Sequence, residues 1–136
     1  MLVVGYDDSD GARRALDVAI DLARPLGEAL VIAFAAQPPG RGVGDEYRTH
    51  LEALEERGRE VTAAAVARAS AAGVTAEAVV ADLKVVDLLL DLADEHSARA
   101  IVVGTYGESP LRGAVLGSTP HKLLHLSRVP VLAVPD

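Results

Sequence analysis

The stretch from residue 2 to residue 27, LVVGYDDSDGARRALDVAIDLARPLG, contains one complete strand, turn and helix. The apolar run Leu2–Tyr6 predicts a buried strand, because short apolar runs bounded by turn residues are typical of parallel sheets. Ser9–Leu26 predicts a helix, since its apolar residues recur on one helical face and Ser9 is a good N-cap. Gly27 stands where helices commonly end in the left-handed conformation. This unit therefore predicts an α/β fold.

The same alternation of strand and helix continues along the rest of the chain. Further strands are predicted at Leu30–Ala36, Val74–Ala81, Ala100–Val103 and Val129–Val134. Further helices are predicted at Asp45–Ala72, with a candidate bend at Gly58, at Val85–His96 and at Thr119–Ser127. Short strands separated by helices predict an open five-stranded parallel sheet with helices on both faces. The loop Gln37–Gly44 is too short to separate domains, so we expect a single domain over residues 1–136.

The composition excludes several classes of protein. The 136 residues include no cysteine, which rules out disulfides, thiolate catalysis and cysteine-bound zinc. The net charge of −7 disfavours nucleic acid and anionic membranes as partners, because both are negatively charged. No apolar run approaches the roughly 18 residues that span a bilayer, and the first residues do not resemble a leader peptide. We therefore expect a cytoplasmic protein.

A glycine-rich segment, Gly104–Thr119, follows the fourth predicted strand and leads into a helix. Ligands of open parallel sheets bind beyond the carboxyl ends of the strands, which here means the segments after Tyr6, Ala35 and Val103. Glycines let the backbone approach a ligand closely, and the free N–H groups of a helix start attract anions. Ser118 is the predicted N-cap of that helix. The residues alone leave two interpretations open, a phosphate cradle and a plain structural turn.

The spacing within this segment resembles the motif of the universal stress proteins. Their motif has two residues between its first two glycines, then nine residues, then Gly-Ser or Gly-Thr. The matching positions are Gly104, Gly107, Gly117 and Ser118. The flanking strands Ile101–Gly104 and Val129–Val134 and the turn Tyr6–Ser9 are also similar to those of the family. The resemblance implies a Rossmann-like fold of the adenine nucleotide alpha hydrolase type.

Family members that lack this glycine motif generally do not bind ATP, so its intact form here implies a nucleotide site. The contacts with the nucleoside are expected from Tyr6, Asp7, Ala35, Val103 and Gly104. The contacts with the phosphates are expected from Gly107, Gly117, Ser118 and Thr119. ATP with Mg²⁺ is the expected ligand, while AMP and a cyclic nucleotide remain open.

Three positions depart from the family pattern. Asp8 replaces the commoner glycine after Asp7, Ala81 replaces a frequent glycine, and Pro120 replaces a helix former. The carboxylate of Asp8 would repel phosphates unless it faces away from them or binds Mg²⁺.

The expected function is a nucleotide-dependent regulatory domain of the stress response rather than an enzyme. The residues before Lys122 do not form a P-loop, so the usual lysine for phosphoryl transfer is missing. Ser109 and Ser118 lack an identifiable His–Asp relay, which argues against a hydrolase. Slow ATP hydrolysis or autophosphorylation is left open.

Two alternative functions use the same fold. One is a nucleotide-free dimerisation module, in which the edge strand Val129–Val134 pairs with a second protomer to form the homodimer that the resemblance implies. The other is a phosphoacceptor receiver domain built on Asp7, Asp8, Asp82 and Thr105, although the lysine it needs after the fifth strand is absent.

A histidine pair is the one metal-ligand pattern that the sequence offers. His121 and His125 have the i, i+4 spacing of helical metal ligands, but no third ligand is evident. A solvated pair is therefore the favoured interpretation, and no metal site is expected.

Overall fold

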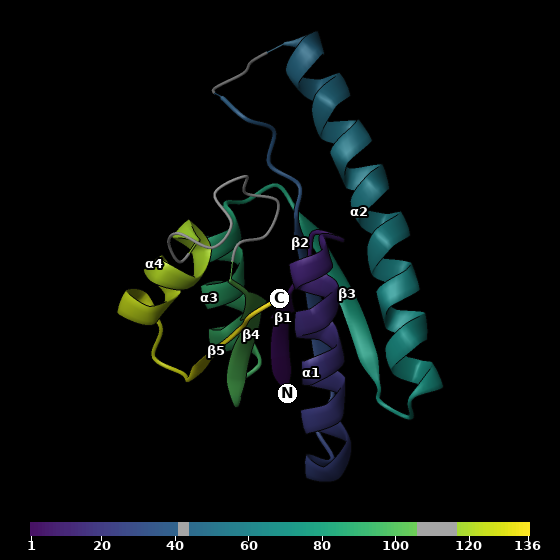
Figure 1. Cartoon of the computed structure of the whole chain (residues 1–136). Helices are drawn as coiled ribbons and strands as arrows, with labels where there is room; N and C mark the ends of the chain where they lie inside the picture. Colours follow the sequence, from purple (N-terminus) through teal and green to yellow (C-terminus); the bar gives the residue numbers. More distant parts are fainter. Residues whose placement is uncertain (41–43, 106–116) are drawn as a thin grey trace.

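The computed structural model describes residues 1–40, 44–105 and 117–136, and within these ranges it forms one five-stranded sheet (Figure 1). The strand order is β3-β2-β1-β4-β5, and all neighbouring strands are parallel. The strands are β1 (Leu2–Gly5), β2 (Leu30–Ala35), β3 (Ala76–Ala81), β4 (Ala100–Gly104) and β5 (Val131–Val134). The described helices are α1 (Asp10–Leu26), α2 (Asp45–Ala71), α3 (Val85–Glu95) and α4 (Ser118–Leu126). The predicted open parallel sheet is confirmed.

Helices cover both faces of the sheet because alternate strand residues point to opposite sides. Val4 and Val102 are fully buried in a core that the sheet shares with α1 and α2. Val3 and Ile101 are fully buried in a second core, which the sheet shares with α3 and α4. The near-continuous apolar strands of the sequence are explained by this double burial.

Both ends of α1 agree with the sequence-based prediction. The hydroxyl of Ser9 accepts a hydrogen bond of 3.1 Å from the Ala12 amide, which caps the amino end. Gly27 ends the helix in the left-handed region at φ +66°. The start of α1 is thereby fixed directly after β1, at the carboxyl edge of the sheet.

The longest described helix, α2, runs unbroken through Gly58 and extends beyond the edge of the sheet (Figure 1). Gly58 is buried, and a Cβ atom there would lie 2.6 Å from Cδ1 of Phe34. Its missing side chain therefore allows a close approach of α2 to β2, where the sequence suggested a bend. No helix in the described ranges is both long and apolar enough to cross a bilayer.

Two predicted boundaries near the chain end are wrong. Gly117, not Ser118, is the N-cap of α4, and Ser118 is the first helical residue. The last strand begins at Val131 rather than Val129, because the Val129 amide bonds the Ser127 hydroxyl at 3.1 Å in a turn that precedes Pro130.

Candidate functional site

The carboxyl edge of the sheet brings together three of the predicted segments. From β1 the chain proceeds to β2 and β3 on one side, and β4 and β5 lie on the other side. Asp7, Ala35 and Thr105 thus lie at the ends of three adjacent strands, around the point where the strand order reverses. This is the position at which open α/β sheets bind their ligands.

The turn after β1 is built around the carboxylate of Asp7. Its Oδ1 atom accepts hydrogen bonds from the Ser9 amide at 3.0 Å and from the Ser9 hydroxyl at 2.5 Å. Both bonds go to one oxygen, and none within the described residues goes to Oδ2. Asp7 is partly buried, and the two bonds from Ser9 fix its carboxylate at the end of β1.

The second carboxylate of this turn, Asp8, is neutralised within the protein. Its Oδ1 accepts hydrogen bonds from Nε of Arg13 at 3.1 Å and from the Tyr6 hydroxyl at 3.2 Å. The Arg13 guanidinium holds the pKa of Asp8 below its usual range, whereas burial, assisted by Asp8, raises the pKa of Tyr6. Asp8 lies in the left-handed region at φ +63°, which is where glycine is most easily accommodated. The expected repulsion of phosphates by Asp8 is therefore reduced by Arg13.

The end of β4 makes direct backbone contact with the start of α1. A Cβ atom on Gly104 would lie 3.0 Å from the carbonyl carbon and oxygen of Gly11. Backbone atoms move aside less easily than a flexible side chain, so packing favours glycine at this position. The two segments that flank the site are thus held against each other.

The amino end of α4 lies next to the end of β4. The Gly117 amide donates a hydrogen bond of 2.7 Å to the Thr105 carbonyl, so this predicted phosphate donor is already used within the protein. The amides of Ser118 and Thr119 belong to the first helical turn and have no acceptor inside the helix. These two amides and the positive end of the helix dipole form the anion-attracting part of the site.

A buried hydroxyl lies at the same place. Oγ1 of Thr105 is shielded from solvent and has no hydrogen-bond partner within the described residues. Leaving such a group unpaired is costly, so this hydroxyl is suited to bond a polar atom of a ligand. Of the other predicted residues, Val103 is buried in the core beneath the edge, and Gly107 lies outside the described residues.

Comparison with known proteins assigns the family. The model of the universal stress protein family matches residues 1–135. The chain belongs to the universal stress protein family. The universal stress protein Rv1636 of Mycobacterium tuberculosis is 32% identical to it, with 98% of this chain and 94% of the relative covered.

Solved structures of other universal stress proteins share the fold. One described as a complex with cAMP is 33% identical, with a TM-score of 0.66 and coverage of 98% and 94% of the two chains. One from Archaeoglobus fulgidus, described as a complex with dAMP, is 26% identical, with a TM-score of 0.67 and coverage of 98% and 95%. Some universal stress proteins of this fold therefore bind adenine nucleotides, and the adenine nucleotide alpha hydrolase-like fold is confirmed.

Sequence reasoning missed two features of the universal stress protein site. The first is the pairing of Arg13, an exposed residue of α1, with Asp8 and also with Asp10. The spacing of Asp10 and Arg13 indicated that second pair, whereas the Asp8 pair depends on the left-handed turn and had no local signal. The unpaired Thr105 hydroxyl also left no trace in the sequence.

The receiver alternative is contradicted by the strand order. Receiver-type flavodoxin-like sheets have the order 2-1-3-4-5, in which the third strand is central. In this universal stress protein β3 is an edge strand, and β2 lies between it and β1. Asp82, which follows β3, is therefore not placed beside Asp7 and Asp8 as a phosphoacceptor cluster requires.

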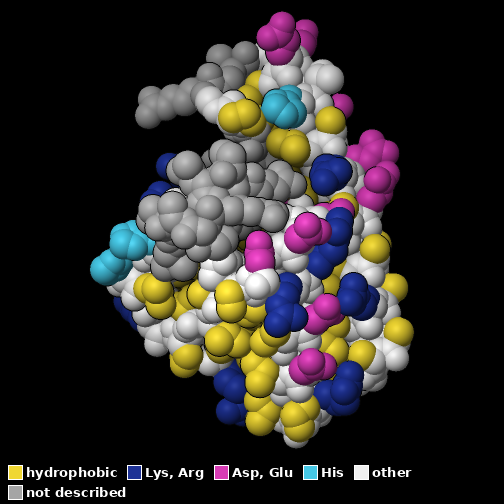
Figure 2. Space-filling model, in the orientation of Figure 1, with side chains coloured by type: hydrophobic (Ala, Val, Ile, Leu, Met, Phe, Trp, Pro, Cys, Tyr) yellow, Lys and Arg dark blue, Asp and Glu magenta, His cyan; other side chains and the backbone are white. Residues whose placement is uncertain are grey.

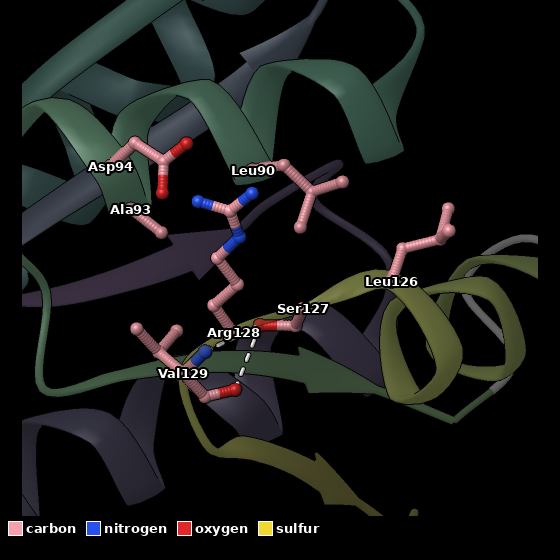
Figure 3. Close-up of a pocket in the computed structure, with 7 residues that line it drawn as sticks. All are labelled: Leu90, Ala93, Asp94, Leu126, Ser127, Arg128 and Val129. Carbon is pink, nitrogen blue, oxygen red and sulfur yellow. Dashed lines mark hydrogen bonds between the residues drawn. The ribbon is translucent and has the colours of Figure 1, made fainter.

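A separate hollow lies between the carboxyl ends of α3 and α4. Figure 3 shows Arg128 extending across it towards Leu90 and Asp94 of α3. Its volume of about 200 Å³ is below the range of 300–1,000 Å³ that is usual for ligand pockets. The hollow is not at the carboxyl edge, and we assign it no ligand.

Proposed function

We propose that this universal stress protein binds an adenine nucleotide, expected to be ATP, at the carboxyl edge of its sheet and acts as a nucleotide-dependent regulatory domain. The observation that carries the proposal is the amino end of α4, whose Ser118 and Thr119 amides lie next to the end of β4. In a protein with a net charge of −7, such a helix start is a local site of positive potential for a phosphate.

The remaining contacts follow from the other two strand ends. Asp7 would use its Oδ2 atom for a ribose or adenine donor, while the end of β2 at Ala35 would lie against the base. Val103 and Gly104 would line the ribose, with Tyr6 at the side of the site. The unpaired hydroxyl of Thr105 fits a ligand that brings a further polar atom to this edge.

The charges of the site fit binding better than hydrolysis. Arg13 occupies the carboxylate of Asp8, and no described cluster of three or more acidic or histidine side chains forms a metal cage. We expect Mg²⁺ to arrive with the phosphates of ATP rather than on a set of protein ligands. The sequence has no P-loop lysine for phosphoryl transfer, so little or no ATP hydrolysis is expected. A cytoplasmic location stays a prediction.

Calorimetric titration with Mg-ATP tests this function, with AMP and cAMP as comparison ligands. Gly117→Val should abolish binding, because it adds a branched side chain beside the Ser118 amide at backbone angles that valine tolerates (φ −58°, ψ 158°). Leu124→Val is the matched control, since it introduces the same side chain on the exposed side of α4. Absence of wild-type binding at millimolar nucleotide would refute the proposal, as would full binding by Gly117→Val.

A second function, homodimerisation, is favoured by the free edge of β5. The strand reads Val-Leu-Ala-Val from residue 131, pairs only with β4 among the described strands, and carries no charge or proline to block further pairing. Figure 2 shows hydrophobic side chains on this part of the surface. The exposed leucines on β5 and α4 are Leu124, Leu126 and Leu132.

The dimer proposal is tested by sedimentation velocity of the whole chain. Leu132→Lys should convert a wild-type dimer to a monomer, because charged side chains on an edge strand oppose pairing. Leu22→Lys is the matched control, since Leu22 is similarly exposed (40% against 38%) but lies on α1. A wild-type monomer at all concentrations would contradict the dimer and leave the nucleotide proposal untouched.

A further inference from the structure

Two histidines lie one helical turn apart on the exposed side of α4. His121 and His125 are both exposed, whereas Pro120 and Leu123 form the buried side of the helix. The centroids of their imidazole rings are 4.9 Å apart, and the ring planes are inclined at 74°. Figure 2 shows histidine side chains at the edge of the molecule where α4 lies. The two rings are therefore near each other and open to solvent.

The separation of the rings matches that of two imidazoles on one metal ion. A Zn²⁺–N bond of about 2.0–2.1 Å places each ring centroid about 3.2 Å from the metal, so a tetrahedral angle separates the centroids by about 5 Å. The observed 4.9 Å agrees with this distance, although the rings now meet edge to face. Binding one shared ion therefore requires the two side chains to rotate, while the helix backbone keeps its place.

The sequence alone favoured a solvated pair, but the proximity of the rings changes that interpretation. We propose that His121 and His125 form a two-histidine site for a divalent transition-metal ion of the Zn²⁺, Ni²⁺ or Cu²⁺ class. Imidazole nitrogen favours these ions, whereas Mg²⁺ and Ca²⁺ favour oxygen ligands. No third histidine or carboxylate completes the site within the described residues. The other coordination positions are thus left to water or to a donor atom from another molecule. The proposal does not depend on nucleotide binding.

Titration of the whole chain with ZnCl₂ alone, followed by calorimetry, tests the site. The informative variant exchanges two neighbouring side chains, His125→Leu with Leu126→His, so that composition and charge are unchanged. The histidines are then five residues apart and point about 140° apart around the helix, which prevents chelation. Both exchanged positions are exposed, so the fold should be retained, and circular dichroism checks this. His121→Ala, which favours the helix, serves as a second variant.

The wild type should bind one Zn²⁺ at least about tenfold more tightly than either variant, because the second imidazole acts at a high effective concentration. Zn²⁺ should also raise the Tm of the wild type more than that of the variants, since it binds the folded helix. His50→Ala is the control, because His50 is an exposed histidine on α2, and this variant should bind like the wild type. Equal Zn²⁺ affinity of the wild type and the exchanged variant would overturn the proposal.

Discussion

Replacing Thr105 by valine should weaken nucleotide binding and at the same time stabilise the free protein. Valine has nearly the shape of threonine and lacks only the hydroxyl, whose oxygen is buried and has no partner in the described part of the chain. An unpaired buried polar group costs about 1–3 kcal/mol, so removing it should raise the free energy of unfolding by up to that amount. For a chain of this size each kcal/mol corresponds to a rise in Tm of about 3–5 °C.

The effect of Thr105→Val on affinity has the opposite sign. If the hydroxyl bonds the nucleotide, its loss removes an interaction of about 1.5 kcal/mol, which corresponds to roughly tenfold weaker binding. Thr62→Val is the matched control, because the Thr62 hydroxyl is buried but bonds the Gly58 carbonyl at 2.6 Å. This control should lose stability and keep full affinity. The assays are thermal unfolding and calorimetric titration with Mg-ATP.

Two results would refute this reasoning about Thr105. A Thr105→Val protein that gains stability but binds Mg-ATP like the wild type shows that the hydroxyl does not contact the ligand. A Thr105→Val protein that loses stability shows that the hydroxyl has a structural partner in the free protein.

Three further substitutions test the packing and charge of the fold. Gly58→Ala should lower the free energy of unfolding by about 1–2 kcal/mol, as measured in urea titrations. The Cβ atom of the new alanine would overlap Phe34, and the higher helix propensity of alanine offsets only part of that strain. Gly104→Ala should be more destabilising than Gly5→Ala in the same titrations, since its Cβ atom meets backbone whereas that of Gly5 meets side chains. Arg13→Gln should raise the pKa of Asp8 in a carboxyl NMR titration, whereas Arg14→Gln should not. The ion pair of Arg13 with Asp8 stabilises the folded protein fully above pH 3.8, the ordinary pKa of the carboxyl group. This stabilisation is lost as the pH falls through the lowered pKa of Asp8 in the folded protein.

The sequence predicted the architecture well because periodicity and caps are local properties. The apolar run from Leu2 and the Ser9 and Gly27 caps are determined by neighbouring residues, and the structure confirms them. The N-cap assignment of Ser118 was wrong because the backbone at Gly117 is held by the Thr105 carbonyl, a contact with the preceding strand. Local sequence does not encode such a contact.

The candidate site was only partly predictable for the same reason. The order of the strand ends follows from the α/β alternation, so the positions of Asp7 and Gly104 could be anticipated. The neutralisation of Asp8 could not, because it requires a left-handed residue whose carboxylate reaches Arg13. The match of Gly104 to the family motif suggested a ligand contact, whereas the structure shows that packing against α1 also favours this glycine.

The backbone of Gly11 limits which residues evolution can place at position 104, because a Cβ atom there would lie 3.0 Å from the Gly11 carbonyl group. A side chain at position 104 would require the Gly11 backbone to give way, and Gly11 lies in the first turn of α1, close to the Asp7 turn. Changes of ligand in related proteins should therefore arise from side chains around this contact, while the contact itself is retained.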